Sequence, residues 1–429
     1  MKALVMSLML VPGLLLAQDS ARPISLDEAV RLARRNAPAT VQARNAVRQN
    51  AASVRTNYAS FLPTLTASSG ASRSEGTNVN QSGVLVPVTR PWNGNHAISA
   101  NLEVFDGGRR YFNLRAAQAN VDAAEASEIT QNFTVALNVK QQYFAVLAAR
   151  ESEGAARKQL EQAEQQLRAA TARVAAGAAT RSDSLRSSIA VGNARLQMLQ
   201  AENSLNSANA ALSRLVGSAD ILTAQTSDTS ETTTIAISEA ELLQLAEQGP
   251  AVRQSQAATA AAKQSSRAAK TPYLPTISAR FGATYQSTVD EFQLWGNPKV
   301  NLYSTSISVN FPIFNGLNRE EGVVRARIAE DNAAANLRDS RLNARQQMVQ
   351  QLGALRTAEA RVQIQQASVQ AGEEDLRVQQ ERYNLGASTL LDLLTSQTTL
   401  DVARQALIQA RLDARTAKAQ IEQLIGRDL

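Results

Sequence analysis

RYNLGASTLLDLL (residues 382–394) interrupts a long helical pattern with a glycine, and RVAAGAATRSDSL (residues 173–185) does the same 209 residues earlier. In both stretches an arginine lies four residues before the glycine and an aspartate lies six residues after it. A glycine commonly ends a helix, and a threonine followed three residues later by an acidic residue commonly starts one. The sequence therefore predicts two helical hairpins, with tips at Gly177 and Gly386.

Four further motif pairs indicate that the whole chain is a tandem duplication with a unit of about 210 residues. The pairs are ISLDEAVRLARRNAP (24–38) with ISEAELLQLAEQGP (237–250), FLPT (61–64) with YLPT (273–276), FDGG (105–108) with FNGL (314–317), and LSRLVG (212–217) with IEQLIG (421–426). Because the pairs keep one order and nearly one spacing, we expect each half to form the same elements. We place the first repeat at 18–217, a linker at 218–236 and the second repeat at 237–429.

Each repeat is expected to contain a helix, a strand pair, a long helix, a tip turn and a returning helix. The expected first helices are 26–60 and 239–272, the strand pairs 64–105 and 276–314, the long helices about 108–175 and 317–384, the tip turns 176–181 and 385–389, and the returning helices 181–216 and 388–425. Serine–glutamate capping boxes at Ser25 and Ser238 favour the first helix starts. We also expect 181–216 to stack end to end on 239–272, with the threonine-rich joint 223–235 outside the stack.

Apolar residues near the tips repeat every seven positions. The stripes are Leu355, Val362, Val369, Leu376 and Tyr383, then Leu393, Leu400, Leu407, Ala414 and Ile421; the first repeat gives Val146, Leu160, Leu167 and Val174, with Glu153 as the single break, then Val191, Met198, Leu205 and Leu212. Such a repeat indicates left-handed coiled coils between paired helices. The fold class is therefore mainly α, built from tandem-duplicated coiled-coil hairpins with a small β part.

Residues 1–17 (MKALVMSLMLVPGLLLA) are typical of a signal peptide, although a buried hydrophobic helix is the alternative. Beyond them no apolar run approaches the ~20 residues that a membrane helix requires. The chain has no cysteine, which excludes disulfides and thiolate metal sites. Its net charge of +6 is spread without a dense basic block, which argues against a nucleic-acid partner. We expect an exported chain that no helix anchors.

The two strand pairs alternate between apolar and small or polar residues, although 64–72 does so weakly. Two interpretations fit: membrane strands, or a soluble sheet with one solvated face. Export and the flanking helices favour membrane strands, whose lipid-facing positions would be Ile98, Ala100, Leu102, Val104, Ile277, Phe281, Tyr285, Tyr303, Ile307, Val309 and Phe311. Four strands cannot close a barrel, so several protomers would share one. Trp92 and Trp295 are either interfacial or ordinary loop residues.

A catalytic function finds little support in the sequence. His96 is the only histidine, and no motif matches a nucleophile, metal or phosphate site. We therefore expect no catalytic, cofactor-binding or metal residues, and no enzyme. An exported soluble coiled-coil scaffold or adhesin is the alternative to a membrane duct, but it does not explain amphipathic strands at the same place in both repeats.

The motifs together resemble the TolC-type outer-membrane efflux protein family over nearly the whole chain after residue 17. The resemblance lies in the duplicated SLxEA-type helix start, LPT before the first strand, F-[DN]-G at the strand exit, and RYxxGxxxxxDLL at the hairpin tip. It implies a homotrimer with a shared 12-stranded transmembrane β-barrel and a trimeric α-barrel that extends into the periplasm. The implied function is a passive exit duct for a periplasmic adaptor protein and an inner-membrane pump.

The resemblance also implies roles for residues of the tips. Adaptor docking would involve Gly177, Ala178, Thr180, Gly386, Ala387 and Thr389, and the periplasmic entrance would involve Asp392, Asp183, Tyr383 and Thr395. Thr395 stands where the best-known members carry a second aspartate, and Ser388 where some carry an arginine. Helix capping alone is the other interpretation of Asp183 and Asp392, and the two roles are compatible.

Overall fold

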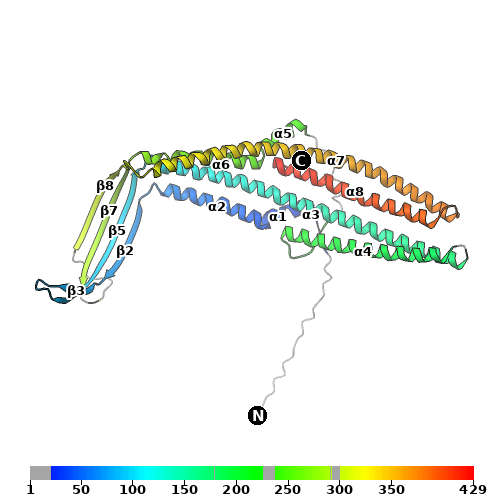
Figure 1. The fold of residues 1–429 in the computed structure, drawn as a ribbon, viewed down its shortest axis with the longest axis horizontal. Coiled ribbons are helices and arrows are strands. Elements are labelled where there is room, and N and C mark those ends of the chain that lie inside the picture. Colours follow the sequence, from blue (N-terminus) through cyan, green and yellow to red (C-terminus); the bar gives the residue numbers. More distant parts are fainter. Residues whose placement is uncertain (1–20, 178, 226–236, 290, 292–299) are drawn as a thin grey trace, which may run out of the picture. The chain divides into compact units, whose positions relative to one another are not determined.

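The computed structural model describes residues 21–177, 179–225, 237–289, 291 and 300–429 (Figure 1). The chain forms two compact units, and each unit takes segments from both repeats. Unit 1 comprises the residues up to Val41, Gln131–Leu243 and Gln347–Leu429; unit 2 comprises Gln42–Thr130 and Gln244–Gln346. Within the described residues, no helix combines the length and apolar character needed to cross a membrane.

The long helices and their returning helices lie where the sequence predicts them. The helices are α1 (Leu26–Asn36), α2 (Pro38–Ala59), α3 (Arg109–Ala175), α4 (Arg181–Val216), α5 (Glu239–Glu247), α6 (Pro250–Ala268), α7 (Asn318–Asn384) and α8 (Leu390–Ile425), with a 3-10 turn at Thr271–Tyr273. Helices α3 and α7 each have 67 residues, so the duplication preserves their length. At 1.5 Å per residue each is roughly 100 Å long.

The first helix of each repeat is broken, which corrects our expectation of single helices over 26–60 and 239–272. The breaks fall at Pro38 and Pro250, which begin α2 and α6. Proline lacks a backbone N–H and clashes with the preceding turn, but it fits the first turn of a new helix. Because the two prolines lie 212 residues apart, the break belongs to the repeated plan.

The end of α4 lies against α1. The Asn36 side-chain nitrogen donates to the carbonyl oxygen of Val216 at 3.5 Å, and Gly217 ends α4 beside the same asparagine. Our expectation that residues 239–272 would stack on this end is therefore wrong. Residues 226–236 of the threonine-rich joint lie outside the described residues.

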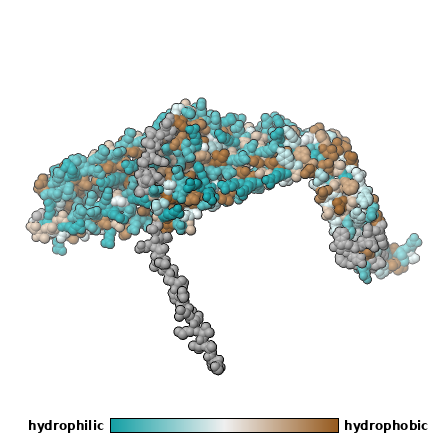
Figure 2. Space-filling model, turned by 180° about the vertical axis from the view of Figure 1, so that it is seen from behind, coloured by the Kyte–Doolittle hydropathy of each residue, from teal (hydrophilic) through white to brown (hydrophobic). Residues whose placement is uncertain are grey.

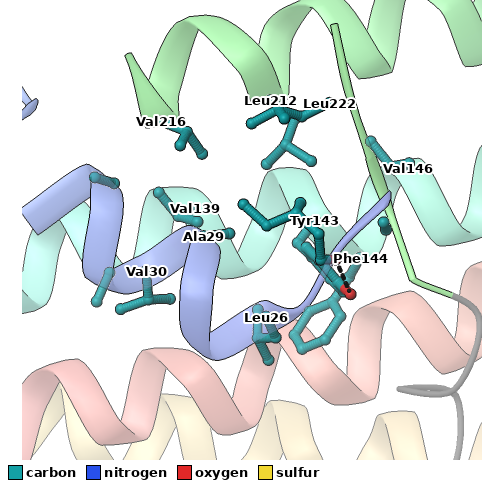
Figure 3. Packing of buried hydrophobic residues seen from close by; sticks show 14 of the residues in the cluster. Leu26, Ala29, Val30, Val139, Tyr143, Phe144, Val146, Leu212, Val216 and Leu222 are labelled. Atoms are coloured by element: carbon teal, nitrogen blue, oxygen red, sulfur yellow. Dashed lines mark hydrogen bonds between the residues drawn. The ribbon is translucent and has the colours of Figure 1, made fainter. Parts of the chain in front are cut away.

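Two three-residue strands that the sequence analysis missed bring distant segments into the core of unit 1. Strand β1 (Arg22–Ile24) pairs in parallel with β6 (Leu222–Ala224), and all three residues of β6 are buried. The start of the joint 223–235 is thus part of the core instead of lying outside the helices. The Tyr143 hydroxyl fastens the pair, since it donates to Ile24 O and accepts from Gln225 N, each at 3.0 Å (Figure 3).

Around this tyrosine, side chains from α1, α3 and α4 form the buried cluster of unit 1 (Figure 3). Its largest fully buried members beside Tyr143 are Val139, Val146, Leu212 and Val216. Burial of each large aliphatic side chain contributes roughly 1.5–3 kcal/mol. The cluster therefore holds the N-terminal segment against the hairpin of the first repeat.

The predicted heptad stripe of the second hairpin is confirmed as a packed seam. Leu393, Leu400 and Ile421 of α8 are each at most 1% exposed. Gly372 of α7 lets the two helices approach closely, because a Cβ there would lie 3.3 Å from Leu400 Cδ1 and 3.5 Å from Leu400 Cα. The seam is therefore tight at this position, and a side chain larger than a methyl group would overpack it.

Gly372→Leu is expected to lower the free energy of unfolding by about 1–3 kcal/mol, because the new side chain overpacks the seam. Gly353 offers a matched control on the same helix, since a Cβ there meets no atom within 4 Å. Gly353→Ala should instead stabilise the protein by up to about 1 kcal/mol through its higher helix propensity. Denaturant unfolding followed by circular dichroism measures both, and equal effects would contradict the close approach.

Unit 2 contains an antiparallel sheet in the order β2-β5-β7-β8. Its strands are β2 (Thr64–Ser72), β5 (Trp92–Phe105), β7 (Thr276–Val289) and β8 (Val300–Asn310). A separate hairpin of β3 (Glu75–Val79) and β4 (Leu85–Thr89) lies in the sequence between β2 and β5. The two strand pairs of the repeats thus meet at β5 and β7 and share one sheet.

A buried ion pair ties the sheet exit to two helices of unit 2. Asp106, 5% exposed, accepts from Gly108 N at 3.1 Å, Arg110 N at 2.9 Å and Arg110 Nε at 3.1 Å. Arg110 in turn donates to Ser60 O at 3.1 Å, and its guanidinium lies 4.9 Å from the Phe61 ring centroid. The second repeat has the same arginine–aromatic contact, with Arg319 4.0 Å from the ring of Tyr273. These contacts explain why an aromatic residue recurs at the first position of FLPT and YLPT.

Asp106→Ala is expected to lower the free energy of unfolding by about 3–5 kcal/mol, because it leaves Arg110 buried without its counter-charge. The second repeat supplies a matched variant, since Asn315 stands at the equivalent position. Asp106→Asn keeps a capping oxygen and should cost less than the alanine variant. Denaturant unfolding of purified protein measures both, and an alanine variant as stable as the wild type would rule out a structural role for the pair.

Candidate functional site

The two hairpin tips form as the sequence predicts. Gly177 has φ 71° and Gly386 has φ 73°, a left-handed conformation that glycine adopts without strain. At the second tip Ala387 N donates to Arg382 O at 2.8 Å and Gly386 N donates to Tyr383 O at 3.1 Å, which satisfies the last carbonyls of α7. Ala178 lies outside the described residues.

Both returning helices start at a complete capping box, so the capping role of the two aspartates is confirmed. Thr180 accepts from Asp183 N at 3.3 Å, and Asp183 Oδ2 accepts from Thr180 N at 3.0 Å. Thr389 and Asp392 repeat these contacts at 3.3 Å and 3.0 Å. Local hydrogen bonds therefore fix both carboxylates at the tips.

The tip carboxylates stay charged over the whole physiological pH range. Hydrogen bonds from the Thr389 hydroxyl and backbone lower the pKa of Asp392, and those from Thr180 lower the pKa of Asp183. Asp392 is exposed, and its Oδ2 atom accepts all three of the bonds from Ser388 and Thr389. Each copy of the chain thus presents a fixed negative charge at the second tip.

An arginine that the sequence analysis did not assign to the site joins the two hairpins of one chain. Arg173 of α3 donates to Tyr383 O at 3.2 Å and Asn384 O at 3.0 Å, and its guanidinium lies 4.7 Å from the Tyr383 ring centroid. Tyr383 thus makes its ring contact with Arg173, whereas Asp183 bonds to Thr180. The sequence feature that could have pointed to this contact is the arginine that occurs four residues before each tip glycine.

A groove lies between α3 of the first hairpin and α7 and α8 of the second, about two to four helical turns back from the tips. Its volume is about 520 Å³. Its lining is rich in amide and charged side chains: Gln162, Gln165, Gln166, Glu373, Arg377 and Gln380. Such side chains offer many hydrogen-bond donors and acceptors to a polar helix surface. Thr395, by contrast, is exposed, and its hydroxyl donates to Leu391 O of its own helix at 2.8 Å.

Nine of the eleven predicted apolar positions fall on one face of the sheet, whereas Val104 is the extra residue of a bulge and Phe311 lies beyond the end of β8. Residues paired across neighbouring strands share a face, and the apolar rows are Ala67–Ile98–Ala283–Tyr303, Leu65–Ala100–Phe281–Thr305, Leu102–Ala279–Ile307 and Phe105–Ile277–Val309. A bulge between Glu103 and Phe105 inserts Val104 as an extra residue and brings Phe105 opposite Ile277. The bulge therefore adds Phe105 to this face.

This apolar face is exposed in the single chain. Ile307 is 75% exposed and Val309 is 67% exposed, and Phe281 and Phe311 are about half exposed. In Figure 2 brown residues gather over the strands at the right, whereas the helices are mostly teal. So large an apolar surface marks a site of contact with lipid or with another protein.

The opposite face of the sheet carries a network of short polar side chains. Thr66 Oγ1 and Ser99 Oγ lie 2.7 Å apart, and Ser278 Oγ and Ser308 Oγ lie 2.8 Å apart. Arg280 Nε donates to Asn101 Oδ1 at 2.7 Å. A sheet that is apolar on one face and polar on the other is suited to separate lipid from a water-filled lumen.

Aromatic residues lie near one end of the apolar face, and one of them is at the start of β5. Trp92 begins this strand and pairs with Val289, and the hydroxyls of Tyr285 and Tyr303 lie 3.4 Å apart. Trp295 lies outside the described residues. Amphipathic rings at the end of an apolar band are typical of the aromatic girdles of membrane strands.

Long duplicated hairpins joined to an amphipathic sheet define the fold of TolC-like channel proteins. A solved structure of CusC superimposes with a TM-score of 0.81 at 20% identity, and the match covers 94% of this chain and 92% of CusC. The sequence model of the outer membrane efflux proteins matches residues 29–218 and 242–427, one range in each repeat. The chain belongs to the outer membrane efflux protein family, and it is an efflux channel of the outer membrane.

Two curated relatives match most of the chain. Pyoverdine export outer membrane protein OpmQ of Pseudomonas aeruginosa is 28% identical over 396 residues, which cover 89% of this chain and 80% of OpmQ. Protein CyaE of Bordetella pertussis is 28% identical over 407 residues, which cover 93% of this chain and 83% of CyaE. Both matches therefore include the helical hairpins and the strands of this chain.

Proposed function

We propose that three copies of this chain assemble into the exit duct of a tripartite efflux system. In this assembly the strands cross the outer membrane as one shared barrel, and the helices form a periplasmic tunnel. A periplasmic adaptor protein docks at the hairpin tips and delivers cargo from an inner-membrane pump. The duct itself is passive: the pump drives transport, and the duct supplies only a polar-lined path for the cargo.

The observation that carries this proposal is the open, amphipathic four-stranded sheet. Strands β2 and β8 are its two edges, and neither has a second neighbour among the described residues. Unpaired edges are not tolerated in lipid, and about eight strands make the smallest barrel. Three copies joined between β8 and β2 would satisfy every edge with twelve strands. The polar network of Arg280 and Asn101 would then line the lumen.

The height of the apolar face fits a membrane. From Ile277 to Tyr285 the strand β7 extends roughly 26 Å along its own axis at 3.3 Å per residue, which is about 20 Å along the membrane normal at the tilt of about 35–45° that membrane strands adopt. An outward-facing apolar band of membrane β-barrels is ≈ 25 Å tall. Tyr285 and Tyr303 would then mark one border of the band, and Phe311 and Phe314, exposed where β8 leads to α7, the other.

We assign adaptor docking to the tips and to the groove near them, and the entrance to the second tip. The groove between the hairpins offers glutamine and charged side chains to a polar helical partner. Asp392, exposed and charged, would form a ring of carboxylates when three copies meet. We also propose entrance roles for Asp183, Tyr383 and Thr395. Within the chain these residues contact Thr180, Arg173 and Leu391, respectively.

Membrane fractionation combined with an unboiled denaturing gel tests the assembly. We expect the protein in the outer-membrane fraction, with a trimer-sized band that boiling converts to the monomer. The competing function, an exported soluble scaffold or adhesin, predicts protein in the soluble periplasm or at the cell surface. A soluble monomer would overturn the proposed duct.

Deletion of the gene, followed by exposure to a panel of toxic compounds, identifies the cargo. The name of OpmQ gives pyoverdine export for that relative. We expect the deletion strain to be sensitive to at least one class of exported compound, and the wild-type gene to restore resistance. That compound then serves as the readout for the variants below.

A further inference from the structure

The contact of Arg173 holds the two hairpins of one chain together near their tips. Its guanidinium donates to the carbonyls of Tyr383 and Asn384, where the negative end of the α7 helix dipole lies. It also covers the Tyr383 ring at 4.7 Å. Three interactions thus converge on a single side chain.

The duplication places a second arginine at the equivalent position of the second hairpin. Arg382 precedes Gly386 by four residues, as Arg173 precedes Gly177. Arg382 is exposed, and its hydrogen bond is a long one of 3.4 Å to Ala387 O in its own tip. One arginine therefore crosses to the neighbouring hairpin, whereas its duplicate is exposed and bonds within its own tip.

The acceptors of the first contact also have duplicates. Val174 and Ala175 end α3 at the positions that correspond to Tyr383 and Asn384. Val174 O accepts from Gly177 N at 3.0 Å, as Tyr383 O accepts from Gly386 N at 3.1 Å. A carbonyl oxygen has two lone pairs and can accept two hydrogen bonds. The last carbonyls of α3 can therefore accept hydrogen bonds from an arginine, as the last carbonyls of α7 accept them from Arg173.

We infer that Arg382 of one copy donates to the carbonyls of Val174 and Ala175 in a second copy of this chain. The inference rests on the proposed trimer, in which the second hairpin of each copy neighbours the first hairpin of the next. Six arginine joints then close the ring of hairpins, three within chains and three between them.

The two kinds of joint differ in one residue. The joint within a chain includes the Tyr383 ring, whereas the joint between chains has Val174 at the equivalent position and lacks a cation–π contact. The joints between chains are therefore weaker. Loss of these weaker joints would let the hairpins of neighbouring protomers separate.

Crosslinking tests the contact directly, because the chain has no cysteine of its own. The test pair is Arg382→Cys with Ala175→Cys, and the matched control is Arg173→Cys with Asn384→Cys. With a short bismaleimide, the test pair should give dimer and trimer bands on a boiled denaturing gel. The control pair should crosslink within one chain and leave the monomer band in place. Each single-cysteine variant gives the background.

The gel separates failure of this inference from failure of the proposed trimer. A trimer on the unboiled gel, without covalent dimers from the test pair, would overturn the Arg382 joint and leave the trimer standing. Absence of the trimer from the unboiled wild-type sample would instead overturn the proposed function.

Channel recordings provide a second measurement with the arginine removed. Arg382→Gln should raise the open fraction of the reconstituted channel by at least tenfold, because loss of one charge-assisted hydrogen bond already shifts an equilibrium by about that factor and the variant removes all three joints between chains. Arg325→Gln is the control, since Arg325 is an exposed arginine of the same helix that pairs with Glu321. An open fraction equal to that of the control would contradict a closing role for Arg382.

Discussion

Gly386→Leu is expected to abolish efflux while the protein still folds and reaches the outer membrane. At φ 73° a leucine adopts a left-handed conformation, which costs roughly 1–2 kcal/mol. A Cβ at Gly386 meets no atom within 4 Å, so the side chain causes no clash inside the protomer. It would instead extend from the tip where we propose that the adaptor docks. The loss of efflux should therefore exceed anything that the change in stability explains.

Gly83 supplies the control for this prediction. It also has a positive φ, 78°, and open space around its Cβ, but it lies between β3 and β4 in unit 2. Gly83→Leu should carry the same backbone cost and leave efflux intact. Resistance to the cargo compound measures efflux, and the unboiled gel measures assembly. Equal resistance of the Gly386 and Gly83 variants would remove the second tip from the docking site.

The sequence predicted the long helices and their tips because the signals for them are local. Glycine with a following threonine–aspartate pair sets both reversals, and the heptad stripe fixes the face on which Leu393 and Leu400 lie. Each signal occurs twice, so the duplication served as an internal check. The alternation of the strands was equally local, and the register confirms that Ile98, Phe281 and Val309 share one face.

The features that the sequence analysis missed depend on contacts between distant segments. Strands β1 and β6 have three residues each, too few to show a period, and they lie about 200 residues apart. The breaks at Pro38 and Pro250 were visible as prolines, but the apolar pattern continues through them. The joint of Arg173 with Tyr383 depends on how two hairpins lie side by side, which spacing along one chain does not give.

The tips combine a rigid local structure with surfaces that a single chain leaves uncovered. Capping boxes and left-handed glycines define each reversal without help from other chains. The exposed Arg382 and the carboxylate of Asp392, by contrast, have mainly contacts within their own tip. Local structure therefore holds these charged groups in place, and assembly determines what they meet.

Removal of the charge at Asp392 is expected to weaken block by multivalent cations and so to raise the conductance measured in their presence. Three copies would bring three of these carboxylates together at the entrance, where they attract and hold cations. Asp392→Asn is the most informative change, because the amide oxygen can still accept from Thr389 N while the charge is lost. Asp392→Ala should produce the same rise in conductance and also remove the cap.

A threonine variant separates the charge of Asp392 from its role as a helix cap. Thr389→Val removes the hydroxyl that accepts from Asp392 N but keeps the carboxylate, so cation block should persist.

Hydrogen bonds from Thr389 lower the pKa of Asp392 in the folded state. The stability that this group contributes is therefore present above the pKa of the unfolded chain and is lost as the pH falls through the lowered, folded value. Cation block should follow the same titration and persist at mildly acidic pH. Planar-bilayer recordings of wild type, Asp392→Asn and Thr389→Val measure these effects, and unchanged block in the asparagine variant would leave Asp392 with capping alone.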